Sequence, residues 1–187
     1  MQEIWTYIES WLYANAPKML DTLQPGASDT QIKAAEDFLC IQFPAEVKAS
    51  YRIHNGQSDD GYGFLEGKEF LSLERIQEEW AVWKELLDAG QFEDFKSSPD
   101  AGIGSDWWSP QWIPLTYDGA GNHDCLDLNP GDGGKRGQII TMWHDELERQ
   151  IVAPSFREWL EQYAEGLKLG QFVFSEEDGG IVNVDDM

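Results

Sequence analysis

The chain has 187 residues, with 35 aspartates and glutamates against 13 lysines and arginines, a formal net charge of −22. This length fits one domain with a substantial core. The negative field opposes binding to nucleic-acid backbones and to anionic membrane surfaces. It would attract a basic protein partner, although maintaining solubility is an equally good explanation of the acidity.

The N-terminal residues, the lengths of the apolar runs and the two cysteines indicate a cytoplasmic protein. Met1-Gln-Glu-Ile-Trp has no basic segment followed by an apolar one, so we expect no signal peptide. No apolar run approaches the ~18 residues that a membrane span requires. Cys40 and Cys125 lie far apart, and we expect two reduced, mostly buried thiols.

The first third of the chain is predicted to be helical. Apolar residues at helical spacing indicate a helix over residues 4–15. A capping box, Ser28-x-x-Gln31, opens a second helix. A short helix follows Pro44, and we expect it to end at a left-handed cap at His54-Asn55-Gly56.

The middle of the chain contains the clearest helix, which Ser72 caps and Gly90 ends. Its apolar residues recur at a spacing of three and four: Leu73, Ile76, Trp80, Trp83 and Leu87. Short strands are expected before it, at 62–65 and 69–71. After it, residues 91–111 are predicted to form a surface excursion that carries Trp107 and Trp108, and an exposed indole there could anchor a partner.

Residues 112–143 are predicted to form a three-stranded antiparallel meander, because glycine-rich turns separate three apolar runs. We expect this meander to display an acidic surface that binds a protein partner. Its predicted contact residues are Asp118, Asn122, Asp124, Asp127 and Asp132.

The last part of the chain is predicted to close the domain. Residues 148–152 suggest an edge strand, and the capping box Ser155-x-x-Glu158 opens a final helix. Residues 175–187 are acidic, and we expect a flexible tail. The prediction is one α+β domain over residues 1–174, with the meander packed against N-terminal helices, a middle helix and a C-terminal helix.

Catalytic and metal-binding chemistry finds little support in the sequence. Cys125 sits among aspartates, whereas a reactive thiol needs an electropositive setting. The aspartates of the meander do not follow the spacing of a calcium loop, and no zinc-ligand spacing occurs. Asp118 and Asp132 flank one strand, roughly 15–20 Å apart, too far to share a metal. We therefore expect no enzyme, no cofactor and no metal, with a metal-assisted hydrolase as the least favoured alternative.

The ordered set of motifs resembles the family of the yeast regulator of cell-wall assembly and glucan synthesis, which belongs to the SUKH superfamily together with bacterial immunity proteins. The resemblance covers residues 20–168. In the first half it rests on Ser28-x-x-Gln31, Glu36, Phe43-Pro44-Ala-Glu46, Ser50-Tyr51-x-x-His54-Asn55-Gly56-Gln57 and Phe70-Leu71-Ser72-Leu73. In the second half it rests on Trp112-Ile113-Pro114-Leu115, Asp118-Gly119, Gly121-Asn122, Asp127-Leu128, Gly137-Gln138-Ile139 and Ser155-Phe156-x-x-Trp159-Leu160.

The resemblance implies an α+β fold without enzymatic activity. Bacterial members bind and neutralise toxins, often nucleases, and the yeast relative is a regulator. Our leading hypothesis is therefore an immunity protein whose meander carboxylates pair with a basic toxin. The alternative is a regulatory or scaffolding module that binds its partner through an apolar patch at Trp107 and Trp108.

Overall fold

The centre of the fold is a four-stranded antiparallel sheet in the strand order β10-β8-β7-β5. It appears in a computed structural model that describes residues 1–58 and 61–187. The strands are β5 (Trp112–Pro114), β7 (His123–Asp127), β8 (Gln138–Met142) and β10 (Ile151–Ala153). Strands β5, β7 and β8 form the three-stranded meander predicted from the sequence, with β7 between β5 and β8 in continuous register, and β10 adds an edge strand. Every residue of β7 is buried.

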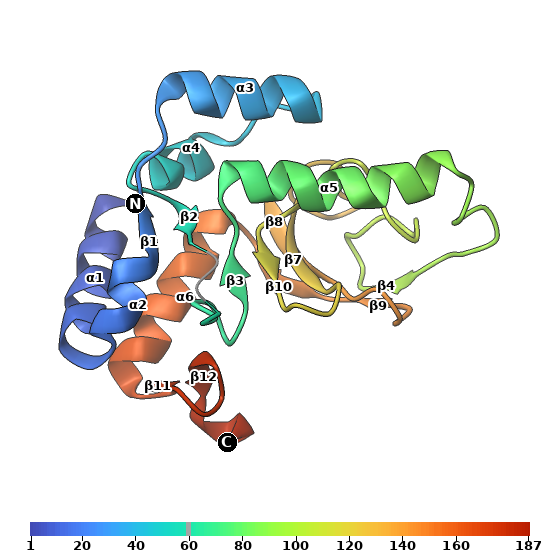
Figure 1. The fold of residues 1–187 in the computed structure, drawn as a ribbon. Helices are drawn as coiled ribbons and strands as arrows, with labels where there is room; N and C mark the ends of the chain where they lie inside the picture. Colours follow the sequence, from blue (N-terminus) through green and yellow to red (C-terminus); the bar gives the residue numbers. More distant parts are fainter. Residues whose placement is uncertain (59–60) are drawn as a thin grey trace.

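The helices are α1 (Gln2–Asn15), α2 (Pro17–Thr22), α3 (Asp29–Leu39), α4 (Ala45–Tyr51), α5 (Leu73–Asp88) and α6 (Phe156–Leu169), followed by a 3-10 turn at Val184–Asp186. Helices α5 and α6 lie against the central sheet, whereas α1 and α2 lie to one side of it (Figure 1). Helix α5 contacts β5 and α3, while α6 contacts β8, β10 and α1. The predicted α+β class, a sheet packed against N-terminal, middle and C-terminal helices, is confirmed.

Four two-stranded sheets surround the central one. Strand β1 (Leu23–Pro25) pairs with β2 (His54–Gln57), and β3 (Glu69–Phe70) pairs with β6 (Thr116–Tyr117). Strand β4 (Ser98–Pro99) runs parallel to β9 (Glu148–Arg149), and β11 (Phe172–Ser175) forms a hairpin with β12 (Gly180–Asn183). The pairing of β3 with β6 brings the start of α5 next to the meander, where the candidate site lies.

The predicted helix starts are confirmed. Ser28 caps α3 in a complete capping box, and the hydroxyls of Ser72 and Ser155 accept the backbone N–H groups of Arg75 and Glu158. Such caps satisfy donors that a helix leaves unpaired at its N-terminus, which is why they can be read from sequence.

The predicted cap at residues 54–56 is wrong, because these residues belong to β2. Gly56 does have the expected positive φ of 71°. Its backbone passes so close to α5 that a Cβ atom would lie 2.3 Å from the amide nitrogen of Ser72. Glycine is therefore required for a close approach of two segments and not for a helix end.

The C-terminal segment forms the β11–β12 hairpin where the sequence suggested a tail. Ile181 is fully buried, and its backbone accepts from the Gly67 N–H and donates to the Gly63 carbonyl. The acidic turn between β11 and β12 dominates the composition of the C-terminal segment. The two short apolar runs beside this turn were therefore not predicted to be strands. Cys40 also differs from expectation: it is exposed at the C-terminal cap of α3, whereas Cys125 is buried as predicted.

Candidate protein-interaction surface

Two hollows lie on either side of the segment that follows β6. The larger is mainly apolar, with a volume of about 510 Å³, and is here called the apolar groove. Helix α5, the loop after it and the turns of the meander form its walls. Its lining residues are Glu79, Val82, Trp83, Leu86, Phe92, Trp107, Tyr117, Ala120, Gly121 and His144.

Aromatic rings form the floor of the apolar groove. Trp83 stacks on Phe92 with ring centres 5.8 Å apart, and Trp107 packs against Phe95 at 5.3 Å. The guanidinium of Arg149, which is fully buried, lies 5.0 Å from the Trp107 ring and donates to the Trp107 carbonyl. These contacts fix the floor, so the groove is a preformed feature of the fold.

The expectation of an exposed tryptophan in residues 91–111 is wrong, since both indoles are buried. Trp108 packs between Trp80 and Trp83, with ring centres 6.2 and 6.3 Å away. Trp107 is 9% exposed and lines the groove. The loop therefore folds back onto α5, because its aromatic residues complete the packing of that helix.

Two apolar residues that line the apolar groove are exposed to solvent. Val82 is 55% exposed and Leu86 is 38% exposed. They are four residues apart, so they lie on one face of α5 on consecutive turns. The helix buries a different face, which carries Ile76, Trp80 and Trp83. Exposed apolar side chains beside an aromatic groove are typical of a binding surface.

His123 lies beneath the groove and has a structural role. Its Nε2 accepts from the Trp83 indole N–H at 3.3 Å, and its Nδ1 donates to the Thr116 carbonyl at 2.7 Å. Burial lowers the pKa of His123, which stabilises the neutral imidazole. Burial also raises the pKa of the neighbouring Cys125 thiol. Neither group is set up for nucleophilic catalysis.

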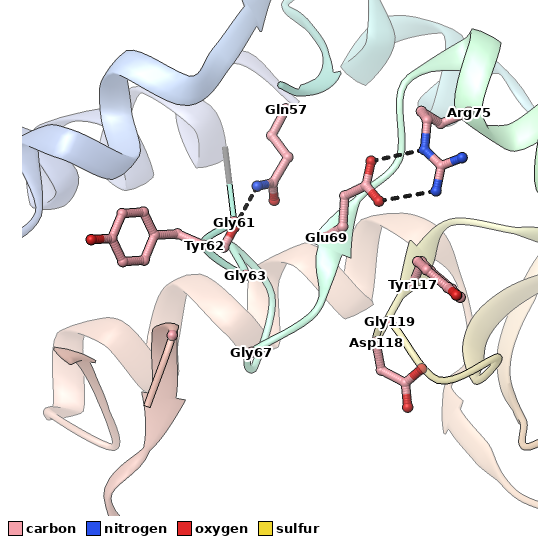
Figure 2. Close-up of a pocket in the computed structure, with 11 residues that line it drawn as sticks. Gln57, Gly61, Tyr62, Gly63, Gly67, Glu69, Arg75, Tyr117, Asp118 and Gly119 are labelled. Atoms are coloured by element: carbon pink, nitrogen blue, oxygen red, sulfur yellow. Dashed lines mark hydrogen bonds and ion pairs between the residues drawn. The ribbon is translucent and has the colours of Figure 1, made fainter. Parts of the chain in front are cut away.

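The smaller hollow has a volume of about 220 Å³, and Arg75 reaches into it (Figure 2). The guanidinium donates to both carboxylate oxygens of Glu69, at 3.2 and 3.3 Å, and to Glu79 at 2.7 Å. Although burial opposes the charge, the carboxylates of Glu69 and Glu78 raise the pKa of Arg75. Its charge is compensated within the protein, so the hollow offers little attraction to an anion.

The turn from Asp118 to Asn122 forms the wall between the two hollows. The Asp118 carboxylate accepts from the Ala120 N–H, the Asn122 N–H and the Asn122 side-chain amide. Although burial opposes ionisation, these hydrogen bonds lower the pKa of Asp118. Asn122 in turn accepts from the His144 N–H at 2.9 Å. Both predicted contact residues thus shape the wall of the groove.

Asp124 and Asp127 are buried, so the prediction that the meander displays them is wrong. Asp124 pairs with Lys68 at 2.8 Å, and Asp127 accepts from the Gln138 amide at 2.9 Å. Burial raises the pKa of Asp127. The physical reason is the central position of β7, which is covered on both faces and has no solvent-facing side.

Asp132 is exposed but lies away from the groove. It occupies the turn after β7, where the Gly131 N–H donates to the Gly102 carbonyl. The structure therefore gathers Trp107, Asp118 and Asn122 around one groove and places the other predicted residues elsewhere. Val82 and Leu86 were not predicted as contact residues, although apolar residues outside the buried face of α5 are a recognisable sign of a binding surface.

Within residues 1–58 and 61–187, no group of three or more histidine, cysteine or acidic side chains is arranged to hold a metal ion. In the same part of the chain, every helix is too short or too polar to cross a lipid bilayer. The site can therefore make apolar contacts with a ligand, and carboxylates lie near these contacts.

The chain resembles fungal regulators. It is 28% identical to "Cell wall assembly regulator SMI1" of Saccharomyces cerevisiae, over 93% of this chain and 42% of that protein. It is 29% identical to "Cell wall biosynthesis/cell cycle regulator smi1" of Schizosaccharomyces pombe, over 97% of this chain and 39% of that protein. The "Glucan synthesis regulatory protein" of Neurospora crassa is also 29% identical, over 93% of this chain and 39% of that protein.

The chain thus spans about two-fifths of the length of these relatives. The region that matches the family, residues 26–162, includes the central sheet, α5 and the lining of the apolar groove. Residues 26–162 match the SMI1 / KNR4 family (SUKH-1), which is more than half of the 187 residues. The protein therefore belongs to the SMI1 / KNR4 family.

Proposed function

We propose that the protein is a non-enzymatic protein-interaction domain with a regulatory role, and that it binds its partner at the apolar groove. The observation that carries this proposal is the pair of exposed apolar residues, Val82 and Leu86, beside a fixed aromatic floor. The names of the relatives, which describe regulators of cell-wall assembly and glucan synthesis, support the regulatory role.

The lining of the groove favours a protein partner over a substrate. Aromatic and aliphatic side chains make up most of its surface, with Glu79, His144 and the Tyr117 phenol as the ionisable groups. Interfaces concentrate binding energy in such aromatic pockets, surrounded by a polar rim. His123, the other histidine near the groove, is occupied by Trp83 and Thr116. A catalytic reaction would need free acid–base groups that converge on the hollow.

A photo-crosslinking amino acid at position 86 tests this proposal in the organism of origin. We expect irradiation to link position 86 to a discrete partner protein, identified by mass spectrometry. The matched control is position 169, a leucine that is 63% exposed at the end of α6. Equal product from both positions, or none from position 86 while a partner co-purifies, would contradict binding at the groove.

A second candidate is the immunity protein, which neutralises a toxin through carboxylates. It is supported by the net charge of −22 and by the exposure of Asp118 and Asp132. Because Asp124 and Asp127 are internal, such a contact would use fewer meander carboxylates than the sequence suggested. The test is co-expression with a polymorphic toxin encoded beside this gene, where rescue of growth supports immunity and continued toxicity rejects it.

Ionic strength separates the two candidates. A toxin held by exposed carboxylates would dissociate at high salt, because surface charges are screened beyond about 8–10 Å at moderate ionic strength. A partner held mainly by Leu86 and the aromatic floor would remain bound at high salt, because its apolar contacts are not screened and any charge pairs contribute only part of its affinity. A pull-down at low and high salt distinguishes these outcomes.

A further inference from the structure

The apolar groove has an acidic surrounding. Exposed carboxylates flank its lining residues in sequence on three segments: α5, the loop after α5, and the turn after β8. They are Glu78, Glu85, Glu93, Asp94 and Asp145, and are here called the acidic rim. An apolar hollow inside such a rim favours ligands that combine apolar bulk with positive charge.

The cations near the groove are already engaged. Arg75 pairs with Glu69, Glu79 and the rim residue Glu78. Lys84 pairs with Asp88, and Lys96 pairs with Asp106. In the described part of the chain, no ion pair involves the rim residues Glu85, Glu93 and Asp94. The rim thus retains negative charge that a partner can neutralise.

This charge discriminates between occupants of the groove. A second copy of the chain would bring another net charge of −22 to an acidic rim, so self-association through the groove is opposed. A neutral apolar segment would fill the groove but leave the rim unpaired. A basic segment satisfies both features, since its apolar side chains enter the groove while its lysines or arginines face the rim.

We infer that the apolar groove binds a lysine- and arginine-rich amphipathic segment of a partner protein, whose large apolar side chains pack on Trp83 and Trp107 between Leu86 and Tyr117. This inference rests on the proposed function and names the chemistry of the partner. Amphipathic helices commonly lie in apolar grooves in this way, with anchors one turn apart. The opposite charges would mainly accelerate association and select the partner.

Fluorescence anisotropy with synthetic peptides tests the inference. The probe is a labelled peptide with leucine and phenylalanine on one helical face and lysine on the other. One control peptide has the same composition with its apolar residues scattered around the helix, and another has glutamate in place of lysine. We expect the patterned lysine peptide to bind most tightly, and its affinity to fall as salt rises.

Matched protein variants locate the binding. Leu86→Ser should weaken binding about tenfold, as expected for an apolar contact near the centre of an interface, whereas Leu169→Ser should leave it unchanged. The combined change Glu85→Gln and Glu93→Gln should reduce the salt dependence. Glu3→Gln, an exposed change on α1, should not. All five positions are exposed, so the variants should fold, which circular dichroism verifies.

The outcomes separate this inference from the proposed function. Equal binding of the patterned and scattered peptides, or equal effects of Leu86→Ser and Leu169→Ser, would overturn binding in the groove. Equal binding of the lysine and glutamate peptides would overturn the basic chemistry. If the peptide fails but position 86 still crosslinks to a partner in cells, the interface stands and the assigned partner chemistry is wrong. If both fail, the groove is not an interface.

Discussion

At the scale of single residues, several motifs that carry the family resemblance turn out to be internal supports. Gln57 is buried, and its side-chain oxygen accepts from the Phe64 and Phe70 N–H groups while its nitrogen donates to the Tyr62 carbonyl. Asn55 likewise accepts the Leu73 N–H at the start of α5. Buried backbone groups need such partners, so these side chains hold the fold together without contacting a partner.

Replacing Gln57 with leucine should lower the free energy of unfolding by about 2–4 kcal/mol, because two buried backbone donors and one acceptor lose their partners. Urea denaturation measures the change. The control is Gln162→Leu on the exposed side of α6, which should alter stability little. Similar effects of the two substitutions would show that the Gln57 hydrogen bonds are not important for stability.

His123 should make stability depend on pH. Burial lowers its folded-state pKa below that of the unfolded chain, so the unfolded state binds the proton first as the pH falls. Stability is therefore lost on acidification, starting near the unfolded pKa of about 6.5 and ending at the lowered folded-state value. A His123→Gln variant, although less stable overall, should lose less further stability between neutral and mildly acidic pH. Parallel curves for the two proteins would contradict this assignment.

At the scale of elements, the sequence was most informative where one physical rule acts alone. Helical periodicity and serine caps located α3, α5 and α6 because both are local properties. Prediction from the sequence failed where tertiary contacts determine which residues are buried and which strands pair. Alternation could not reveal that β7 is covered on both faces, so Asp127 was placed on the surface. The contacts of β12 with residues 63–67 could not be read from an acidic composition either.

The β11–β12 hairpin should therefore contribute to stability. Ile181→Ala should lower the free energy of unfolding by about 2–4 kcal/mol, the range for truncating a buried aliphatic side chain. The matched control is Val184→Ala, at the residue directly after β12, where the side chain is 40% exposed; it should have a small effect. If Ile181→Ala is as mild as the control, the segment behaves as the tail that the sequence suggested.

At the scale of the whole molecule, the groove arises from parts that are distant in sequence. Helix α5 supplies Trp83 and Leu86, the loop after it supplies Trp107, and the meander supplies Tyr117 and His144. The sequence identified Trp107, Asp118 and Asn122 as candidates. The pairing of β3 with β6 brings Asp118 and Asn122 next to α5, and the contacts of Trp107 with Phe95 and Arg149 place its ring in the groove. The net charge, in contrast, is fully readable from sequence and acts on the entire surface.

This charge should make the protein more stable as salt increases. With 35 acidic and 13 basic residues, repulsion within the folded state outweighs attraction. Raising ionic strength from roughly 0.02 to 0.5 M shortens the screening length well below 10 Å and should raise the melting temperature by a few degrees. Scanning calorimetry in sodium chloride, potassium chloride and choline chloride checks this, and similar shifts in all three indicate screening. A fall in melting temperature would mean that the ion pairs of Arg75 and its neighbours outweigh the repulsion. A rise in one salt alone would indicate a specific cation site.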